Sequence, residues 1–162
     1  MINLGHGVFS NQTFTFSGTA WELNEQVMFD SVMKIPVFIF RAIGTIELVG
    51  KSTLIPGVWN TDFSFTSRTV TLQTENPEII KSLGFTNCGF KTGVTVDVPD
   101  EGCGGFLNGV KNCPVEYDLI LIKGDDLFLG DRPFTNNLCK SELRSNRLRS
   151  YSHKRVQTVK IN

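Results

Sequence analysis

Apolar and polar positions alternate along most of the chain, in short runs separated by turn-forming residues. The clearest case is a predicted β-hairpin. Residues 117–122 and 127–129 form its two strands, and residues 123–126, Lys-Gly-Asp-Asp, supply the turn. Pairing Ile122 with Leu127 sets the register of the two strands.

Shorter segments of the same kind precede the hairpin. Strand-like patterns lie at 14–16, 21–23, 37–48, 62–66, 68–72 and 93–98, whereas residues 1–12 show no strong pattern. The only convincing helix spans 76–83, because Asn76 can cap it, Pro77 suits its first turn and Gly84 can end it. Short strands with one short helix predict an all-β, antiparallel domain, a closed or half-open β-barrel-like sheet without exposed edges. No internal repeat or linker is present, so we expect one domain over residues 1–162.

Phenylalanine is strongly over-represented, with 13 Phe against 2 Tyr and 2 Trp. Along 37–48, one set of alternate positions is expected to face the interior: Phe38, Phe40, Ala42, Ile46 and Leu48. On the next strands the expected inward residues are Phe63, Phe65, Val70 and Leu72. The four Phe among these residues could line a ligand cavity or could simply fill the core. Spacing alone favours the filled core, and both interpretations stay open.

The chain contains 4 cysteines, Cys88, Cys103, Cys113 and Cys139. Their spacing does not match a paired C-x-x-C zinc pattern, and the chain has only 2 histidines, so no metal site is expected. Two disulfide bonds are the better explanation. The hairpin register, carried outward, brings Cys113 to within a few residues of Cys139. This favours a Cys113–Cys139 bond and leaves Cys88–Cys103 as the second.

Two disulfide bonds predict an extracellular or otherwise oxidising compartment. Residues 11–13, Asn-Gln-Thr, form a glycosylation sequon, which has meaning only in a secreted protein. In contrast, the first residues carry neither the basic nor the apolar region of a signal peptide. No stretch reaches the roughly 18 apolar residues of a membrane-spanning helix. The cysteines and the start of the chain therefore point in different directions.

Known catalytic arrangements are not evident in the sequence. His6 and His153 do not neighbour a Ser or Cys in a recognisable nucleophile motif. Asp97, Asp125 and Asp126 could act as acid or base only if buried and paired, and acidic residues in turns are usually solvated. No phosphate loop is found, and the strands lack the basic and stacking residues of an oligonucleotide platform. We therefore expect a non-enzymatic protein without cofactor, metal or nucleic-acid partner.

Charge is unevenly distributed, although the formal net charge is +0. The C-terminal segment 140–162 holds one acid, Glu142, and the basic residues Lys140, Arg144, Arg147, Arg149, Lys154, Arg155 and Lys160. Such a segment could bind phosphate or a membrane surface. The simpler expectation is a solvated segment held near the acidic remainder of its own chain.

Several short motifs follow one another in a definite order. They are Cys88-Gly89, Gly93-Val-Thr-Val-Asp-Val98, Gly102-Cys103, Glu116-Tyr-Asp118 and Leu127-Phe-Leu-Gly-Asp-Arg-Pro133, preceded by Pro36-Val-Phe-Ile-Phe-Arg-Ala-Ile-Gly44, Ser52, Pro56-Gly57 and Asp62-Phe63. In order and spacing they resemble the domain of the adenomatosis polyposis coli down-regulated (APC-down-regulated) family over residues 14–151. The chain lacks the family's first strand and has Met33 where the family has a cysteine.

The resemblance implies a secreted or membrane-anchored β-barrel-like protein with an open hydrophobic pocket for lipid, and animal members inhibit the Wnt pathway. We therefore expect a non-enzymatic module that binds a lipid or acylated ligand. Its candidate pocket residues are Phe38, Phe40, Phe63, Phe65, Val94, Val96, Leu119 and Leu121. The alternative is a structural or protein-interaction module with a solid core. Its sign would be an exposed apolar patch on loops near Trp59 or Phe134.

Overall fold

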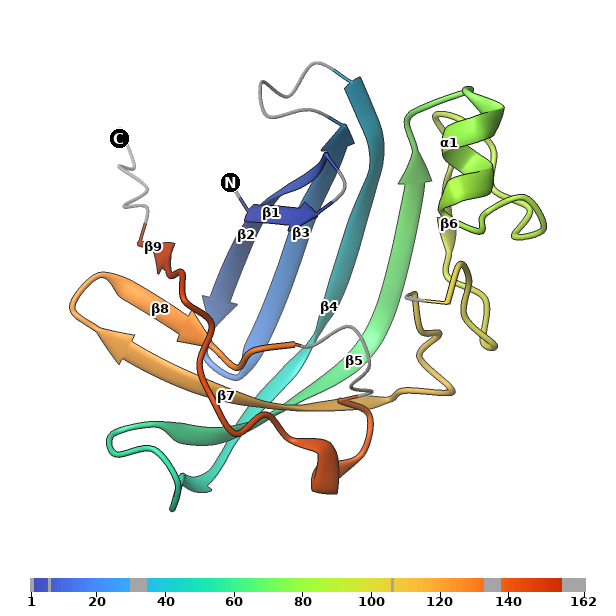
Figure 1. Ribbon diagram of the computed structural model, residues 1–162. Helices are drawn as coiled ribbons and strands as arrows, with labels where there is room; N and C mark the ends of the chain where they lie inside the picture. Colours follow the sequence, from blue (N-terminus) through green and yellow to red (C-terminus); the bar gives the residue numbers. More distant parts are fainter. Residues whose placement is uncertain (1, 6, 30–34, 106, 133–137, 156–162) are drawn as a thin grey trace, which may run out of the picture. The chain divides into compact units, whose positions relative to one another are not determined.

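A computed structural model gives the fold and describes residues 2–5, 7–29, 35–105, 107–132 and 138–155 (Figure 1). Its strands are β1 (Ile2–Gly5), β2 (Val8–Ser17), β3 (Ala20–Phe29), β4 (Ile35–Lys51), β5 (Trp59–Leu72), β6 (Thr95–Asp97), β7 (Val115–Lys123), β8 (Asp126–Leu129) and β9 (His153–Lys154). The helix α1 (Pro77–Ser82) and a 3-10 turn at Ser141–Leu143 complete the regular structure of the described residues. The described part of the chain is therefore built mainly from strands.

These strands form one hydrogen-bonded sheet in the order β1-β2-β3-β4-β5-β7-β8-β9, and β6 pairs with β5 off this path. The pairings that the structure resolves residue by residue are antiparallel. This confirms the predicted all-β, antiparallel fold with one short helix. Apart from β6, strands that follow one another in sequence are neighbours in the sheet, which is the order of an up-and-down barrel. One predicted strand is shorter than expected, because β6 covers only part of residues 93–98.

The chain divides into two compact units. Unit 1 comprises residues 1–46 and 64–115, and unit 2 comprises residues 47–63 and 116–162. The long strands β4 and β5 contribute to both units. Unit 1 also holds β1, β2, β3, β6 and α1, whereas unit 2 holds β7, β8 and β9.

In unit 1, β2 and β3 form a hairpin in which Phe16 pairs with Trp21. The predicted strands at 14–16 and 21–23 are confirmed, although each is part of a strand of 10 residues. The start of β2 also pairs with β1, where Ile2 lies opposite Ser10. These first strands lie where the sequence showed no strong pattern. At the start of β2, the adjacent apolar residues Val8 and Phe9 are followed by three polar residues, so its pairing depends on neighbouring strands more than on alternation.

A β-bulge lies at the start of β4. Val27 pairs with Phe38, whereas the next residue, Met28, pairs with Pro36, so Val37 is an additional residue. Val37 and Phe38 are both buried in the same core cluster. The expectation that alternation alone decides burial along β4 is wrong at two positions. Val37 is buried although it lies outside the apolar set, and Leu48, expected inside, is exposed.

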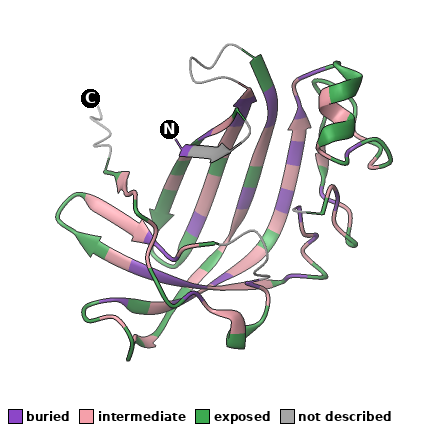
Figure 2. Cartoon of the chain, in the orientation of Figure 1, coloured by how far each residue is buried: buried purple, intermediate pink, exposed green. Residues whose placement is uncertain are grey.

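The strand β5 is continuous, which corrects the prediction of separate strands at 62–66 and 68–72. Its buried residues change parity: Thr61 and Phe63 are buried in the first half, and Arg68, Val70 and Leu72 in the second. Figure 2 shows how buried and intermediate positions alternate along β5. One additional residue within a strand produces such a change. The break in the apolar pattern therefore marks an irregularity in one strand instead of a gap between two strands.

The helix α1 is confirmed close to its predicted bounds. The Asn76 side chain accepts hydrogen bonds from the backbone N–H groups of Glu78 and Ile79, and Pro77 occupies the first turn. Leu83 ends the helix, and Gly84 follows it with a positive φ of 71°. The capping residues in the sequence thus locate this helix correctly.

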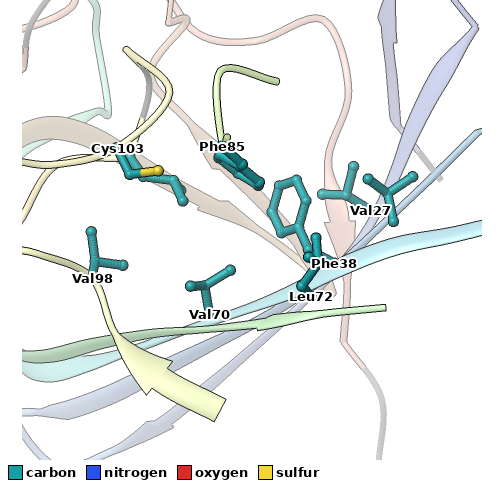
Figure 3. Packing of buried hydrophobic residues seen from close by; sticks show 9 residues of the cluster. Val27, Phe38, Val70, Leu72, Phe85, Val98 and Cys103 are labelled. Carbon is teal, nitrogen blue, oxygen red and sulfur yellow. The ribbon is translucent and has the colours of Figure 1, made fainter. Parts of the chain in front are cut away.

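The hydrophobic core of unit 1 lies between the strands and the segment that follows α1 (Figure 3). Its buried members are Val27, Val37, Phe38, Val70, Leu72, Phe85, Val98, Cys103 and Leu107. Phe85 is central, with its ring centroid 5.5 Å from that of Phe38 and 5.1 Å from that of Phe90, both in edge-to-face arrangement. The helix and its following loop therefore close one end of this face of the sheet.

In unit 2, the hairpin of β7 and β8 has the predicted register. Ile122 pairs with Leu127, and the pairing continues to Ile120 and Leu129. The turn itself is Gly124-Asp125, and Gly124 has a positive φ of 61°, which glycine adopts without strain. The apolar alternation and the turn residues together were sufficient to place every pair of this hairpin.

No cysteine is free. Cys88 is bonded to Cys103 with their Cα atoms 6.0 Å apart, which confirms this predicted bond. Cys113 and Cys139 are also disulfide-bonded. Because the chain has 4 cysteines, the second bond joins these two, as predicted. Two disulfide bonds fit an oxidising compartment.

Removal of the Cys88–Cys103 bond is expected to destabilise the protein. The two residues are 15 apart in the sequence, and a closed loop of this size contributes about 3 kcal/mol in the chain-entropy model. The double variant C88S/C103S should therefore lose about 3 kcal/mol of unfolding free energy, measured by urea denaturation without reductant. Unfolding at the urea concentration of the wild type would contradict this expectation.

Candidate functional site

The eight predicted pocket residues are divided between the two units: Phe38, Phe40, Phe65, Val94 and Val96 belong to unit 1, and Phe63, Leu119 and Leu121 belong to unit 2. Phe38 belongs to the buried core of unit 1, and Phe40 and Val96 pack against it. Val94 is exposed just before β6. In unit 2, Phe63 and Leu119 are buried and Leu121 is half-buried. Leu119 and Leu121 share one face of β7, opposite to Glu116 and Asp118.

Phe38 fills the core of unit 1. Only 4% of its surface is exposed, and its ring packs against Phe85. Of the two interpretations that the sequence left open, core packing therefore describes Phe38. A side chain that is surrounded on all sides has no surface left for a ligand.

The same face of the sheet is only partly covered farther along the strands. We call this part the aromatic face; its residues are Phe14, Phe16, Trp21, Leu23, Phe40 and Phe65. Their shared orientation follows from the register, which pairs Phe14 with Leu23 and Phe16 with Trp21. Glu25, two residues from Leu23, pairs with Phe40.

Ring contacts hold the buried side of the aromatic face together. Phe65 lies edge-to-face against Trp21 at 5.1 Å, and the Arg68 guanidinium stacks on the Phe65 ring at 3.5 Å. Trp21 is buried, and its Nε1 donates to the carbonyl oxygen of Thr45 at 3.1 Å. In contrast, Phe14, Leu23, Phe40 and Phe65 are half-buried, and 40% of Phe16 is exposed.

Three polar residues lie next to the aromatic face on β2 and β3. Ser10, Gln12 and Glu25 share this face of the sheet, as the register of β2 with β3 shows. The Ser10 hydroxyl and the Gln12 amide both donate to Oε1 of Glu25, at 2.5 Å and 2.7 Å. The Gln12 Oε1 atom is buried and accepts no hydrogen bond from the described residues. A purely packed apolar core would not place a carboxylate here.

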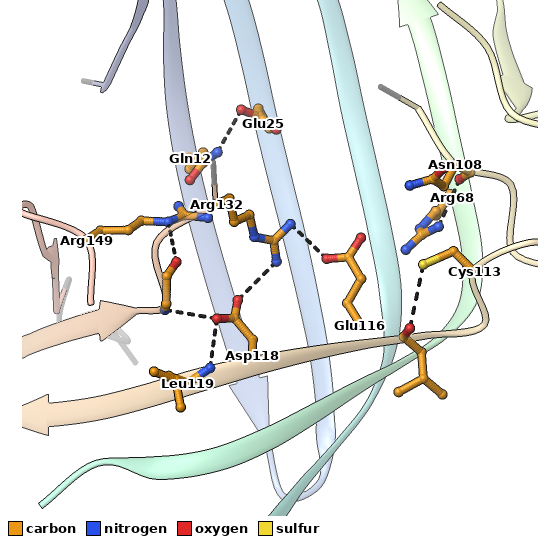
Figure 4. Close-up of polar contacts among 12 residues, drawn as sticks. Gln12, Glu25, Arg68, Asn108, Cys113, Glu116, Asp118, Leu119, Arg132 and Arg149 are labelled. Carbon is orange, nitrogen blue, oxygen red and sulfur yellow. Dashed lines mark hydrogen bonds and ion pairs between the residues drawn. The ribbon is translucent and has the colours of Figure 1, made fainter. Parts of the chain in front are cut away.

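Unit 2 contains a second polar arrangement, around Asp118 (Figure 4). Asp118 is fully buried, and its Oδ1 accepts hydrogen bonds from the backbone N–H groups of Leu119 at 2.7 Å and Gly130 at 2.9 Å. Its other oxygen pairs with Arg132 at 3.1 Å, and Arg132 also pairs with Glu116 at 2.7 Å. A Cβ atom at Gly130 would clash with Asp118 Oδ1, so this contact requires glycine.

The surroundings of Arg132 combine burial with access to solvent. Burial lowers the pKa of Arg132, but Glu116 and Asp118 outweigh this effect and raise it above its ordinary value. Nevertheless, 40% of the side chain is accessible, whereas Asp118 has no accessible surface. Arg132 is therefore a permanently charged group that protein atoms surround and water still reaches.

Part of the basic C-terminal segment is bound to acidic residues of its own chain. Arg144 donates to Asp62 at 2.6 Å and to the carbonyl oxygens of Thr61 and Asp118 at 2.7 Å and 2.8 Å. Two further ion pairs of the segment are Arg147–Asp131 and Lys154–Asp126. These contacts agree with a segment held near acidic residues of its own chain. The three hydrogen bonds of Arg144 also fix this side chain in one place, which is not expected of a solvated tail.

Arg149 differs from the other arginines of this segment. Its Nε donates to the carbonyl oxygen of Gly130 at 3.0 Å, and its Nη1 donates to the Tyr151 hydroxyl at 2.9 Å. Burial lowers its pKa, and the nearby charge of Arg132 acts in the same direction. No carboxylate of the described residues lies within ion-pair distance of it.

The three acidic residues that could act in acid–base catalysis are exposed or bound to other side chains. Asp97 and Asp125 are both exposed, and Asp126 is bound to Lys154 and Ser152. Within the described ranges, no group of three or more His, Cys, Asp or Glu side chains is arranged to hold a metal ion. Among those same residues, no helix has the length and apolar character needed to cross a membrane.

Sequence reasoning missed both polar arrangements. The motifs at 116–118 and 127–133 belong to the ordered series that resembles a known family, yet their order alone does not show that Arg132 pairs with both Glu116 and Asp118. The alternate spacing of Ser10 and Gln12 was the only signal for the first arrangement. No known protein-family model matches the chain, and no curated protein is significantly similar to it. The family assignment therefore stays a prediction.

Proposed function

We propose that the chain is a non-enzymatic module that binds a long apolar ligand, such as a lipid acyl chain, against the aromatic face of unit 1. The supporting observation is the change in burial along one face of the sheet. Val27 and Phe38 are buried at one end of this face, whereas Phe14, Phe40 and especially Phe16 remain partly accessible farther along. The Wnt connection is a further prediction that rests on the family resemblance.

The chemistry of the aromatic face favours an apolar ligand. Full burial of a phenylalanine side chain contributes about 1.5–3 kcal/mol. A ligand that covers several half-buried rings would therefore gain a favourable contribution to its binding free energy. The Phe65 ring is held by Trp21 and Arg68, which reduces the rearrangement that this ring needs to accept a chain. The polar group of Ser10, Gln12 and Glu25 limits the apolar stretch at one end and offers hydrogen-bond partners to a polar ligand end. Two disulfide bonds agree with the proposed extracellular location.

Phe16→Ser is expected to weaken binding of a fluorescent fatty acid about fivefold to tenfold, because it removes an accessible ring from the aromatic face. The protein fold should change little, since Phe16 is 40% exposed. Titration with the fluorescent fatty acid measures the affinity. In a Trp59→Phe background, Trp21 is the one remaining tryptophan, so its fluorescence emission reports on the aromatic face. Leu54→Ser is the matched control, because Leu54 is 71% exposed in unit 2. Absence of binding by the wild type would refute the proposal.

A protein-interaction module is the second candidate function. Near the turn between β4 and β5, four large apolar residues are exposed: Leu48, Val49, Leu54 and Trp59. Lys51 lies over the Trp59 ring at 5.8 Å. This is the sign expected for that alternative near Trp59, whereas Phe134 lies outside the described residues. Absence of fatty-acid binding by the wild type would favour this second function.

A further inference from the structure

A pair of hydrogen-bond donors in unit 2 lies half-buried without an acceptor among the described residues. Arg149 Nη2 has no hydrogen-bond partner among the described residues, because the Arg149 bonds use Nε and Nη1. The Tyr151 hydroxyl accepts from Arg149 Nη1, so its own proton remains available for donation. No described residue accepts that proton. Both side chains are half-buried.

The position of this pair is set by neighbouring contacts. The Arg149 guanidinium is anchored to the Gly130 carbonyl, next to the Asp118 network (Figure 4). The Tyr151 ring lies edge-to-face against His153, with centroids 6.0 Å apart. The two donors are therefore held in place before any ligand arrives, which reduces the entropy cost of binding.

The charges around the pair favour an anion. Arg132, Arg144 and Arg147 each pair with at least one carboxylate, whereas Arg149 pairs with none among the described residues. Burial and the charge of Arg149 lower the pKa of His153 to about 4, so His153 is neutral at pH 7. Asp118 also attracts the Arg149 charge, but burial and Arg132 outweigh this attraction, so the pKa of Arg149 is lowered. An anion bound directly to the guanidinium would recover part of the free-energy cost of this burial.

We infer that Arg149 and Tyr151 form a binding site for an oxyanion of the carboxylate or phosphate class. One ligand oxygen would accept hydrogen bonds from Arg149 Nη2 and from the Tyr151 hydroxyl, and the bond to the guanidinium would be charge-assisted. A free anion and the acidic head group of an amphiphile share this chemistry. The inference stands independently of the apolar ligand proposed for unit 1, because it uses residues of unit 2 alone.

The test is a titration of the full chain followed by NMR of the aromatic side chains, with sodium phosphate, sodium acetate, decanoate and decanol as separate probes. Saturable shifts of the Tyr151 and His153 ring signals are expected with at least one of the three anions. Shifts with phosphate or acetate would identify a free anion as the ligand. Shifts with decanoate alone would identify an acidic head group. Equal shifts with decanol, or none with any anion, would overturn the inference.

Three variants locate the effect. Tyr151→Phe removes only the hydroxyl and should weaken anion binding about tenfold, and Arg149→Lys should weaken it at least as much because the planar fork is lost. Arg147→Lys is the matched control, since this largely exposed side chain pairs with Asp131 and should leave the affinity unchanged. Wild-type affinity in Y151F and R149K, with thermal midpoints showing both variants folded, would also overturn the inference.

Discussion

Replacing Asp118 with alanine is expected to lower the free energy of unfolding by about 3–5 kcal/mol. The carboxylate is fully buried and accepts hydrogen bonds from the N–H groups of Leu119 and Gly130 and from the Arg132 guanidinium. Alanine would leave both backbone groups without this acceptor and would remove one of the two carboxylates that hold Arg132. The loss is large because buried polar groups that lose their partners pay their full desolvation cost.

Asp118→Asn separates the two contributions. Asparagine keeps an oxygen for the two N–H groups but loses the charge that pairs with Arg132, so we expect a smaller loss of about 1–3 kcal/mol. Urea denaturation followed by circular dichroism measures both variants. Glu22→Gln is the matched control, because it removes an exposed ion pair with Arg41 and should change stability little. If D118A were as stable as E22Q, the central role of Asp118 in unit 2 would be wrong.

The parts of the fold that local sequence determines were predictable. Alternation and a Gly-Asp turn are both contained within residues 117–129, and the register of Ile122 with Leu127 is correct. The helix at 77–82 was located by the short-range chemistry of Asn76 and Pro77. In each case the deciding interactions lie within a few residues in sequence, so the pattern itself carries the information.

The irregular parts of the sheet were not predictable in the same way. The additional residue at Val37 and the parity change along β5 depend on which residue of a neighbouring strand lies opposite. A period of two can show that the alternation changes parity, but it does not show whether the strand ends there or continues with an irregularity. The start of β2 was not predictable either, because its residues form a strand through pairing with β1 and β3 and show no alternation of their own.

The candidate site was predictable only in part. The inward orientation of Phe38, Phe40 and Phe65 follows from alternation, but their unequal burial depends on the position of Phe85 and the loop after α1. Arg132 and Asp118 are separated by residues of β8 and meet only because the hairpin folds back. The spacing of charged residues along the sequence does not predict an ion pair such as Arg132–Asp118. Polar networks on the inner face of a sheet therefore require the structure.

Phe38→Ala and Phe16→Ala are expected to have opposite effects on stability and ligand binding. Phe38 is 4% exposed and packs against Phe85, so its truncation should cost about 3–5 kcal/mol of unfolding free energy. Phe16 is 40% exposed, and its truncation should cost less than about 1 kcal/mol. Urea denaturation measures both values, and fatty-acid titration under native conditions measures affinity in the folded fraction.

The comparison of these two variants tests how one face of the sheet is divided between packing and binding. If Phe38 fills the core and Phe16 contacts ligand, F38A keeps the wild-type affinity in its folded fraction, whereas F16A keeps the stability and loses affinity. Phe16 stacks on Phe14 with ring centroids 6.2 Å apart, so Phe14→Ala should resemble F16A in its effect on binding. Equal loss of affinity in F38A and F16A, with both folded, would place the ligand against Phe38 and contradict the division between a buried core and an accessible aromatic face.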